Sequence, residues 1–499
     1  MNTLARTQNS KRNVFNGIIN FSITSFLHFL VRTIFIRTLS VDILGINGLY
    51  VNILQVLSLG ELGLSNIALH TMYKPLQKHD KKEISRMVTF YSRIYNIIAV
   101  AIFAIGLAVI PFLPAIANSN LPMHSLIGYY ILFLLNTSIS YIGISKQLLI
   151  NADQNIRVIK NATTLITVVQ SIAQIVLLQV TRSYYLYLII QCVCTAALNF
   201  YLARRAKRMY KFINKQEGLS KKKRRSIIRM TKDLFIYKVS VVIVNSTDNI
   251  LISVLLGAVV VGYYSNYVMV FSIVANLLYL IIQSVSSSIG HLAAEASNQK
   301  KLAVFYKILF IMQWIVTVAS VCLLALLNDT IRIWAGESFV LSQLVVVAIV
   351  TNFYTSNVIN PVWMYREAMG LYGAVKWTMA VTAALNIVLS CILGLAIGLS
   401  GILFATAISR ILTTVWYEPT ILLKKNLGDS VGKYYRTQLK NLIIFLVIAI
   451  LVCQVSAIFI PNNFMTLLAK AVLVFLGASL LYVIFQNGQT RTVLKWLRS

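Results

Sequence analysis

Residues 441–460 read NLIIFLVIAILVCQVSAIFI, an apolar run without a charged side chain. As a helix this run is about 30 Å long, which matches the hydrocarbon core of a lipid bilayer. Similar runs recur along the whole chain, which is 58% hydrophobic and only 12% charged. A transmembrane β-barrel would show short segments of alternating polarity instead of continuous apolar runs. The sequence therefore predicts an all-α polytopic membrane protein.

The other apolar segments bring the predicted total to about fourteen transmembrane helices. We place them at 14–38, 44–72, 87–113, 125–149, 163–181, 184–203, 237–256, 263–290, 303–327, 343–365, 376–397, 402–423, 441–460 and 466–486. They form two six-helix lobes followed by two extra C-terminal helices. The predicted domains are an N-lobe at 1–203, a basic cytoplasmic loop at 204–236, a C-lobe at 237–423, and helices 13 and 14 with a cytoplasmic tail at 424–499.

Positive charge is abundant, with 45 Lys and Arg against 14 Asp and Glu and a formal net charge of +31. Most of it falls into the loops on one side of the predicted helices, above all between Arg204 and Lys238. The loops on the other side carry Arg37, Arg182 and Arg332. This asymmetry is the positive-inside pattern, and it predicts that both termini lie in the cytoplasm. No module of basic and aromatic residues accompanies the charge, so we predict no nucleic-acid partner.

Motifs of enzymes and metal sites do not appear in the sequence. The five cysteines all fall within predicted spans, which is typical of buried, inert thiols rather than of disulfides or metal ligands. Paired carboxylates, a nucleophile elbow and metal-ligand spacings are all missing, and the longest predicted outer loop, at 328–342, is short. We therefore predict neither catalytic residues nor a bound metal, and we expect a transporter rather than an enzyme.

A weak internal sequence similarity links the two predicted lobes. Residues 35–54 and 252–271 align without gaps, and each segment joins the first helix of its lobe to the second. The identical positions are Leu39 with Leu256, Gly45 with Gly262, Tyr50 with Tyr267, and Val51 with Val268. Matches at this frequency also arise by chance between apolar segments. A real repeat would relate the lobes by an axis along the membrane normal, as in transporters with a substrate path between lobes.

Polar residues form a row along the first predicted helix, at Asn16, Asn20, Thr24, His28 and Arg32. Residues four apart on a helix form one ridge. A lipid-facing surface would present this ridge at a high cost in free energy, so we expect it to face protein or water. We predict Arg32 and His28 as substrate-binding residues, and Asn20 as a lining residue of a polar cavity.

The other charges in predicted spans include Glu61 on helix 2, Asp248 on helix 7 and Arg410 on helix 12. Asn245 shares a face of helix 7 with Asp248 and Asn249, because residues three and four apart are neighbours. Ionisable residues inside a membrane are costly and mark functional sites by default. Pairing between helices for packing alone is the open alternative for each of them.

The functional interpretation of these charges is a hydrated cationic cavity between the lobes. Arg410 is a predicted substrate-binding residue beside Arg32, since arginine can hold a phosphate with two parallel hydrogen bonds. Glu61 and Asp248 are predicted to balance charge or to bind a coupling ion. The predicted polar lining comprises Asn20, Asn245, Asn249 and Asn357.

Residues 44–91, LGINGLYVNILQVLSLGELGLSNIALHTMYKPLQKHDKKEISRMVTFY, resemble the second helix and following loop of bacterial polysaccharide flippases. These flippases belong to the multidrug/oligosaccharidyl-lipid/polysaccharide (MOP) superfamily, which is related in fold to the MATE exporters. NDTIRIWAGESFV (328–340) resembles the outer loop before helix 10 of the family, and YREAMGLYGAVKW (365–377) resembles the inner loop after it. The motifs cover a minor part of the chain, whereas the likeness in architecture covers all of it.

The resemblance implies a carrier that moves undecaprenyl-pyrophosphate-linked oligosaccharide units across the bacterial cytoplasmic membrane by alternating access. Arg32 matches the cationic position on the first helix of these relatives, whereas Arg410 is offered by its depth in the membrane alone. The related lipid II flippases also have fourteen spans, and their last two helices form a groove for the lipid tail. Their acidic residue after the first-helix arginine is replaced here by Thr33, which weakens a lipid II assignment.

The leading hypothesis is therefore a flippase for lipid-linked oligosaccharides, serving the assembly of a surface polysaccharide such as capsule or O-antigen. Its expected partners are the lipid-linked substrate and membrane lipids, with a polysaccharide polymerase and assembly proteins as candidates. It needs no cofactor, and H+ or Na+ coupling would supply the energy. A multidrug or cation antiporter of the same fold, or a lipid II flippase, is the alternative. A membrane polymerase or glycosyltransferase is a third and less favoured class.

Overall fold

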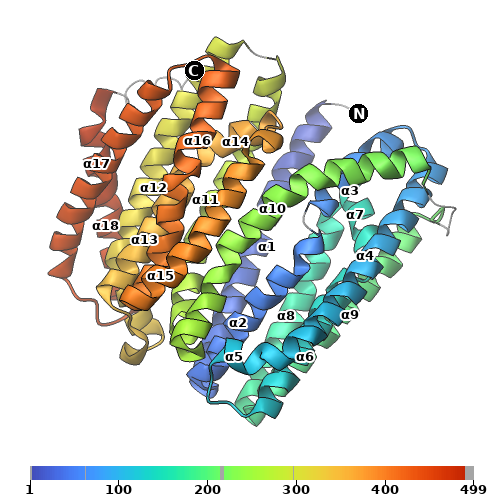
Figure 1. Cartoon of the computed structure of the whole chain (residues 1–499), viewed down its shortest axis with the longest axis horizontal. Coiled ribbons are helices and arrows are strands. Elements are labelled where there is room, and N and C mark those ends of the chain that lie inside the picture. Colours follow the sequence, from blue (N-terminus) through green and yellow to red (C-terminus); the bar gives the residue numbers. More distant parts are fainter. Residues whose placement is uncertain (1–2, 62, 214–218, 296, 489–499) are drawn as a thin grey trace. The chain divides into compact units, whose positions relative to one another are not determined.

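The computed structural model describes residues 3–61, 63–213, 219–295 and 297–488 (Figure 1). Within these ranges, the side chains at 3–19, 21, 60, 222, 226, 228–234, 284, 286–288, 290–291 and 293–295 are not described. The predicted C-terminal tail at 489–499 and the centre of the predicted basic loop, 214–218, lie outside the described residues. The part of the chain that the structure describes consists of helices and their connections, without a strand. The all-α fold class is confirmed.

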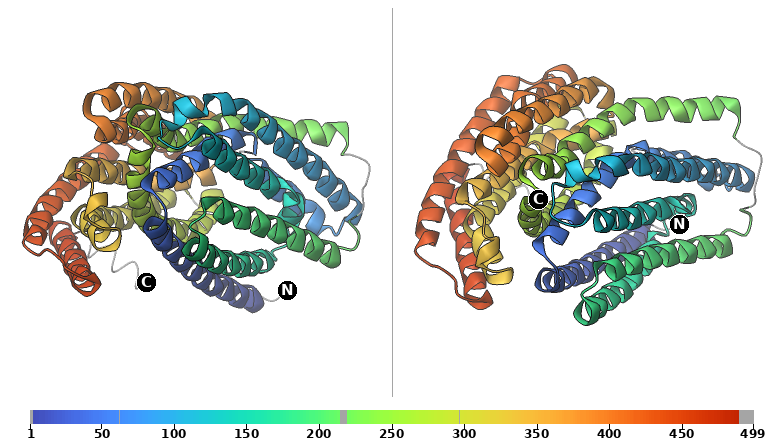
Figure 2. Two further views of the ribbon diagram at one scale, coloured as in Figure 1. Left: turned by 90° about the horizontal axis from the view of Figure 1, so that it is seen from below. Right: turned by 60° about the horizontal axis from the view of Figure 1, so that its bottom comes forward.

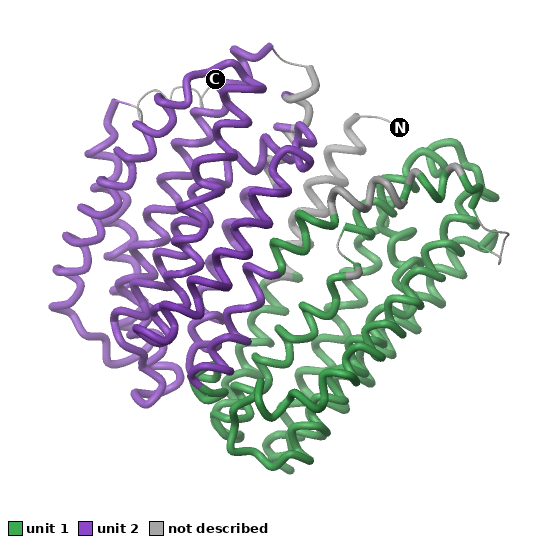
Figure 3. The backbone as a smooth tube through the Cα atoms, in the orientation of Figure 1, with its two compact units in different colours: residues 1–242, 257–262 green, residues 243–256, 263–499 purple. Residues whose placement is uncertain are grey.

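The helices form two compact units (Figure 3). Unit 1 comprises residues 1–242 and 257–262, and unit 2 comprises residues 243–256 and 263–499. The boundary falls inside one long helix, α10 (Lys221–Leu256), and not in the basic loop that precedes it. The predicted division into lobes therefore stays a prediction.

Unit 1 contains helices α1 to α9, the first part of α10 and residues 257–262 at the start of α11. The helix α8 packs against both α1 and α9, and Figure 2 shows these neighbours side by side. The elements are α1 (Thr3–Thr38), α2 (Val41–Leu57), η1 (Ser58–Glu61), α3 (Leu64–Gln77), α4 (Lys81–Val109), η2 (Ile110–Phe112), α5 (Leu113–Ala117), α6 (Met123–Tyr141), α7 (Ile144–Ala152), α8 (Ile156–Thr181) and α9 (Tyr184–Met209).

Unit 2 contains the rest of α10, α11 from residue 263 onward and the helices that follow it, with α12 packed against α13, α17 and α18. The elements are α11 (Ala258–Glu295), α12 (Asn298–Trp334), η3 (Glu337–Phe339), α13 (Gln343–Val358), α14 (Asn360–Ala368), α15 (Tyr372–Leu412), α16 (Thr414–Thr420), the π-helix η4 (Ile421–Leu427), α17 (Val431–Ala457) and α18 (Phe464–Phe485).

Ten helices among the described residues are long and apolar enough to cross a membrane, or up to eleven if the bent pair α6–α7 counts as one span. The chain is a multi-pass membrane protein. The predicted number of fourteen spans and the cytoplasmic position of both termini are not confirmed. Predicted helix 2 at 44–72 accounts for part of the difference between the predicted and the observed number of spans. The structure divides it into α2 with 17 residues and α3 with 14 residues.

Predicted helices 11 and 12, at 376–397 and 402–423, lie within one helical run from Tyr372 to Leu427. The backbone leaves helical geometry at Ile397 and Gly398. The hydroxyl groups of Thr382 and Thr413 nevertheless lie 2.7 Å apart. In a straight helix these residues would be separated by about 45 Å, at 1.5 Å per residue. The run is therefore an antiparallel hairpin, with its turn between the two predicted helices.

Two helices of unit 1 are broken at glycines with a positive φ. Gly63 separates α2 and η1 from α3, and Gly143 separates α6 from α7; both have a φ of +85°. The second break bends the helix pair by 44°. Glycine lacks a Cβ and adopts this backbone conformation without the strain that other residues incur. Glycine at these two positions therefore permits the breaks.

Gly45 of α2 packs against Gly262 and its neighbours, which also belong to unit 1. A Cβ added to Gly45 would overlap the carbonyl oxygen of Ala258, and a Cβ added to Gly262 would lie 2.6 Å from the carbonyl oxygen of Val41. Each carbonyl belongs to the residue four positions before the partner glycine, so the contact is reciprocal. Residues without a side chain allow such close approach of two helix backbones. Gly45 and Gly262 are also identical positions in the alignment of residues 35–54 with residues 252–271.

Tyr50 and Tyr267, a second matched pair, have equivalent contacts within their own units. Both side chains are fully buried. The Tyr50 hydroxyl donates to the carbonyl oxygen of Leu126 at 3.0 Å, near the start of α6. The Tyr267 hydroxyl accepts from the backbone N–H of Leu341 at 2.8 Å, just before α13. Because α6 and α13 correspond to predicted helices 4 and 10, these contacts support an internal repeat.

Buried polar contacts attach α17 and α18 to the rest of unit 2. Lys470 of α18 is 5% exposed and donates to Asp329 of α12 at 2.8 Å. Arg332 holds the other oxygen of this carboxylate at 2.9 Å. Gln313 of α12 donates to Gln438 of α17 at 2.5 Å. Lipid tails are as apolar as leucine side chains, so polar contacts of this kind give helix association its specificity in a membrane.

Replacing Lys470 with methionine is expected to destabilise the protein by about 1–3 kcal/mol, because Asp329 stays buried and loses a charged donor. Arg332 still holds one oxygen and limits the loss. We expect a lower midpoint of thermal unfolding in detergent. Lys425→Met, at an exposed position of the π-helix, serves as the control and should unfold like the unchanged protein. Equal midpoints for both variants would contradict a stabilising role of the Lys470–Asp329 pair.

Candidate functional site

Arg410, near the end of α15, is the centre of a polar cluster in unit 2. Its side chain is only 8% exposed. Nη1 donates to Asn352 Oδ1 at 2.5 Å and to the hydroxyl of Ser356, both on α13. Nη2 donates to Asn245 Oδ1 on α10 at 3.1 Å. Neutral acceptors from two helices thus hold the guanidinium.

Asp248 lies one turn further along α10 and begins a second polar cluster. Its buried carboxylate accepts from the Thr406 hydroxyl, with distances of 3.2 and 3.0 Å to its two oxygens. The Thr406 hydroxyl oxygen accepts from Asn386 Nδ2 at 2.9 Å. Asn386 Oδ1 in turn accepts from the Thr247 hydroxyl at 3.4 Å. The cluster therefore connects α10 to both arms of the α15 hairpin.

Arg410 and Asp248 together give unit 2 an interior site with one positive and one negative charge. Asn245 and Asp248 are three positions apart on α10 and lie on one face of it, so the two clusters adjoin. Phosphate oxygens form stronger, charge-assisted hydrogen bonds to a guanidinium than amide oxygens do. Asn245 is exposed, so an anion can replace it as an acceptor for Arg410. The carboxylate, amide and hydroxyl oxygens around Asp248 are the ligands that hard cations prefer.

Asn249 and Asn357 lie outside these contacts. The buried side-chain oxygen of Asn249 has no hydrogen-bond partner among the described residues. Asn357 donates to the carbonyl oxygen of Phe353 at 2.8 Å and accepts from Asn360 at 3.1 Å, so it serves the junction of α13 and α14. Across the described ranges, no group of three or more His, Cys, Asp or Glu side chains is placed to hold a metal ion.

Arg32, His28 and Asn20 lie along α1 in unit 1, as predicted. Arg32 is half-buried, and its guanidinium carbon lies 6.0 Å from the centre of the Phe35 ring. That ring packs edge-on against Tyr184 of α9, with 5.5 Å between the ring centres. His28 is exposed one turn away. The amide nitrogen of Asn20 is buried and has no partner in the part of the chain that is described.

Glu61 lies at the break of predicted helix 2, where η1 ends. It accepts from the Ser65 hydroxyl at 2.8 Å, and this hydroxyl also lies 2.8 Å from the Tyr95 hydroxyl. Tyr95 of α4 stacks on Tyr141, the last residue of α6, with 6.4 Å between the ring centres. An ionisable group is thus placed where the two broken helices of unit 1 meet.

A buried ion pair in unit 2 was missed by reasoning from the sequence. Arg366 Nη1 lies 2.7 Å from Glu418 Oε2, and both residues are 2% exposed. The rings of Trp363 and Tyr372 each lie 5.7 Å from the guanidinium carbon. The sequence places Arg366 in a loop, whereas the structure places it in the interior on the short helix α14. Pro361 was the available signal, because proline is favoured in the first turn of a new helix.

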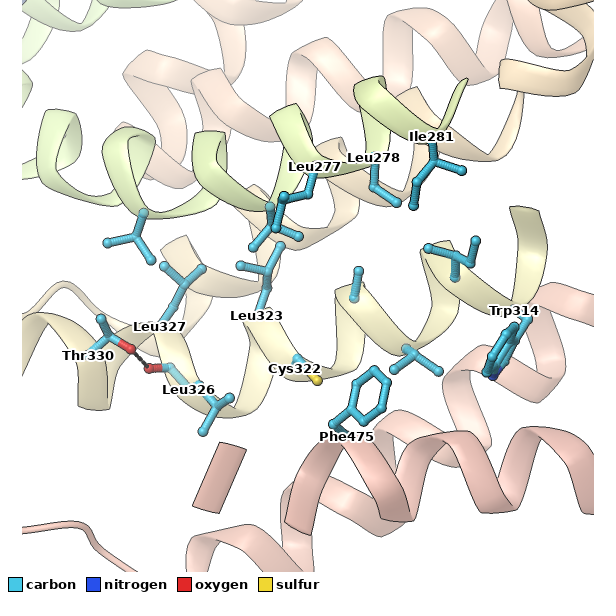
Figure 4. Close-up of a pocket in the computed structure, with 15 residues that line it drawn as sticks. Leu277, Leu278, Ile281, Trp314, Cys322, Leu323, Leu326, Leu327, Thr330 and Phe475 are labelled. Carbon is cyan, nitrogen blue, oxygen red and sulfur yellow. Dashed lines mark hydrogen bonds between the residues drawn. The ribbon is translucent and has the colours of Figure 1, made fainter. Parts of the chain in front are cut away.

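An apolar cavity of about 530 Å³ opens in unit 2 (Figure 4). Leu277 and Leu278 of α11 face Leu323 and Leu327 of α12 across it, and Phe475 of α18 contributes a further part of the wall. The resemblance predicts an apolar groove formed by the last two helices. In the structure, α11 and α12 supply most of the lining and α18 supplies one residue, because α18 packs against α12.

No protein-family model matches the sequence, and no curated protein matches it either. Solved structures do match. The lipid II flippase MurJ, in an inward closed conformation, aligns with 95% of this chain and 99% of its own, with a TM-score of 0.68 and 15% identity. An inward-facing multidrug resistance MATE family transporter of the MOP superfamily aligns with 82% of this chain and 99% of its own, with a TM-score of 0.62 and 16% identity. A mutant of the MATE transporter VcmN from Vibrio cholerae aligns with 85% and 99%, with a TM-score of 0.56 and 13% identity.

These matches define the class of protein to which the fold corresponds. The chain has the fold of the MOP superfamily, which includes the MurJ flippase and the MATE transporters. The resemblance found in the sequence is thereby confirmed for the fold. The solved structures with this fold are a flippase and transporters. The substrate has to be argued from the site, since fold does not fix function.

Proposed function

We propose that the protein is a flippase that moves undecaprenyl-pyrophosphate-linked oligosaccharide units from the inner to the outer leaflet of the bacterial cytoplasmic membrane. The units serve surface-polysaccharide assembly, such as capsule or O-antigen. The observation that carries this proposal is Arg410, a buried guanidinium whose hydrogen bonds all go to neutral acceptors. A charge buried in a membrane segment is costly and is typical of a functional site. The pyrophosphate is the anionic part of the proposed substrate.

Recognition of the pyrophosphate would proceed by exchange of hydrogen-bond acceptors. Asn245 is exposed and accepts from Arg410 Nη2, so a phosphate oxygen can take its place. Asn352 continues to hold Nη1 and keeps the guanidinium in position. Arg32 of unit 1, whose guanidinium carbon lies 6.0 Å from the Phe35 ring centre, remains the predicted cationic residue of α1. The hydroxyl and amide groups of α13 suit a sugar-bearing ligand, and alternating access would then expose the headgroup to the other side.

The apolar cavity of unit 2 offers a place for the polyprenyl tail. The cavity has a volume of about 530 Å³, and most of its lining consists of leucine, valine and isoleucine side chains of α11 and α12. Burying an apolar chain there gains about 25 cal/mol for each Å² removed from water, whereas a sugar or a phosphate would lose its hydration. The tail can therefore remain in an apolar environment while the headgroup occupies the polar site.

Filling this cavity with a larger side chain is expected to slow translocation. Ala319 lines the cavity on α12, and Ala319→Trp would place an indole ring where the tail binds. We expect a several-fold lower rate of flipping in proteoliposomes with a fluorescent polyprenyl-pyrophosphate glycolipid. Val472→Trp, at a 50% exposed position of α18 outside the cavity lining, is the matched control and should retain the full rate. An unchanged rate in Ala319→Trp would argue against this location of the tail.

The cluster around Asp248 is the proposed site of the coupling ion. The carboxylate is buried, and the oxygens of Thr406 and Asn386 lie within its hydrogen-bond network. Oxygen ligands of this kind fit a sodium ion, and the carboxylate alone is able to take up a proton. Occupation by either cation would compensate the negative charge of Asp248 and so change its attraction to Arg410. Ion binding at Asp248 would in this way be coupled to anion binding at Arg410.

A lipid II flippase is the second candidate function. The match to MurJ over 95% of the chain favours it, and lipid II also carries a pyrophosphate on a polyprenyl chain. Thr33 speaks against it, because the resemblance calls for an acidic residue after Arg32. A multidrug antiporter fits the site of unit 2 less well, because a pocket for cationic drugs should be acidic, whereas Arg410 brings a buried positive charge to this site.

Depletion of the protein in its native cells tests the proposal. We expect polyprenyl-pyrophosphate-linked oligosaccharide to accumulate in the inner leaflet while surface polysaccharide is lost. Accumulation of lipid II with cell lysis would establish the second candidate instead. Unchanged lipid-linked sugars, together with new sensitivity to cationic drugs, would overturn both in favour of an antiporter.

A further inference from the structure

The C-terminal part of α9 in unit 1 exposes an aromatic and basic surface. Phe200 is 67% exposed and Tyr201 is 52% exposed. The following two turns carry four exposed basic side chains, here called the α9 cations: Arg204, Arg205, Lys207 and Arg208.

These residues all lie on one side of the helix. Successive residues of an α-helix are rotated by about 100°, so positions 200, 201, 204, 205, 207 and 208 cover about half of its circumference. The opposite side carries Leu202 and Ala206, which are fully buried. One half of α9 is therefore fixed against unit 1, while the other half presents the α9 cations to the surroundings.

Two described carboxylates of unit 1, Glu83 and Asp153, already have partners. Glu83 pairs with Lys223 at 2.5 Å and with Arg86 at 3.9 Å. Asp153 accepts from the hydroxyl of Tyr210, the residue after α9, at 2.7 Å. Among the described residues, none of the α9 cations forms an ion pair. Within the described residues their positive charge is therefore not neutralised, and it can attract an external anion.

The position of the α9 cations along the helix indicates which ligand is near. The apolar stretch of α9 precedes them directly, so they lie at the edge of the hydrocarbon layer. Exposed aromatic residues such as Phe200 and Tyr201 are typical of this interface, where their rings reach the headgroup level. Arg204 lies over the Phe200 ring, with 6.0 Å from its guanidinium carbon to the ring centre. Lipid phosphates lie at this depth, and arginine binds a phosphate through two parallel hydrogen bonds.

We infer that the α9 cations form a binding site for the headgroup of an anionic phospholipid of the phosphatidylglycerol class, with Phe200 and Tyr201 against its glycerol and upper acyl chains. Arg204, Arg205 and Arg208 contact the phosphate, and the excess positive charge selects an anionic over a zwitterionic headgroup. This site is separate from the polar clusters around Arg410 and Asp248. It does not depend on what the protein transports.

Native mass spectrometry of the full-length protein in detergent tests the inference, with phosphatidylglycerol and phosphatidylcholine added in turn. The unchanged protein should retain phosphatidylglycerol in preference to phosphatidylcholine, and added salt should weaken this preference. The triple variant R204Q/R205Q/R208Q should bind phosphatidylglycerol about a hundredfold more weakly, since each interfacial basic residue contributes about fivefold.

The matched control removes three cations from the start of α17, in K433Q/R436Q/K440Q. There Lys433 lies over the Tyr306 ring at 4.4 Å, and Lys440 donates to Gln486 at 3.0 Å. The control should keep phosphatidylglycerol binding. Equal losses in both triple variants would show a general charge effect and overturn the site. Equal binding of the two lipids by the unchanged protein would overturn it even if neither variant folds.

Discussion

Arg410→Lys is expected to lower the rate of translocation about 30- to 100-fold while the protein still inserts and folds. Lysine keeps the positive charge that faces Asp248, but it lacks the planar fork that reaches Asn245 and Asn352 at once. A phosphate bound by one charged hydrogen bond instead of two loses about 2–3 kcal/mol, which corresponds to this factor. The measurement is the flipping of a fluorescent polyprenyl-pyrophosphate glycolipid in proteoliposomes.

A control variant and a measurement of stability accompany this test. Arg436→Lys, at an exposed position of α17, should flip the lipid at the full rate. The thermal midpoint of Arg410→Lys should stay near that of the unchanged protein, because no buried carboxylate loses its counter-charge. Full translocation by a correctly folded Arg410→Lys protein would show that Arg410 serves packing between α10, α13 and α15, which is the alternative left open by the sequence.

Arg410, Asp248 and the neutral Asn245 could be singled out from the sequence, whereas Thr406 and Asn386 could not. Arg410 and Asp248 stand out because a charge within an apolar run is costly and rarely accidental. Thr406 and Asn386 do not stand out, since hydroxyl and amide side chains in membrane helices often serve helix contacts alone. They reach Asp248 only because the α15 run reverses at Ile397 and Gly398.

Hydropathy predicts where helices lie, but it does not distinguish the uses of glycine within them. Gly45 and Gly63 are both glycines of predicted helix 2. The first allows a close backbone contact within an unbroken helix, and the second adopts a φ of +85° and ends the helix. Glycine is common in membrane helices for several reasons. The broken form of predicted helix 2 therefore depends on tertiary contacts that the sequence does not display.

The ion-pair partners of charged residues near helix ends could not be predicted from the sequence either. Lys470 and Arg366 both fall near the ends of predicted spans, where a long side chain can extend to the headgroups. The structure instead pairs Lys470 with Asp329 and Arg366 with Glu418, from segments distant in the sequence. The sequence shows that Lys470 and Arg366 are charged. Their partners follow from the packing of α12 with α18 and of α14 with the helices after α15.

Gly45→Ala is expected to destabilise the protein by about 3 kcal/mol or to prevent its folding, although it adds a single methyl group. The new Cβ would overlap the carbonyl oxygen of Ala258, and this oxygen belongs to a helix backbone that has no rotamer to change. Overpacking of a tight contact commonly costs about 1–3 kcal/mol, and a backbone contact lies at the upper end. The readouts are the yield of folded protein in detergent and the midpoint of its thermal unfolding.

Gly477→Ala provides the matched control, because a Cβ at this position of α18 meets nothing within 4 Å. Alanine is favoured over glycine in a helix by about 1 kcal/mol, so this variant should be slightly more stable than the unchanged protein. Gly262→Ala should resemble Gly45→Ala, since its Cβ meets the Val41 carbonyl at 2.6 Å in the reciprocal arrangement. The double variant should lose less than the sum of the two, because one widened contact relieves both overlaps. Additive losses would mean that the two glycines act at independent places, which would contradict their reciprocal contact.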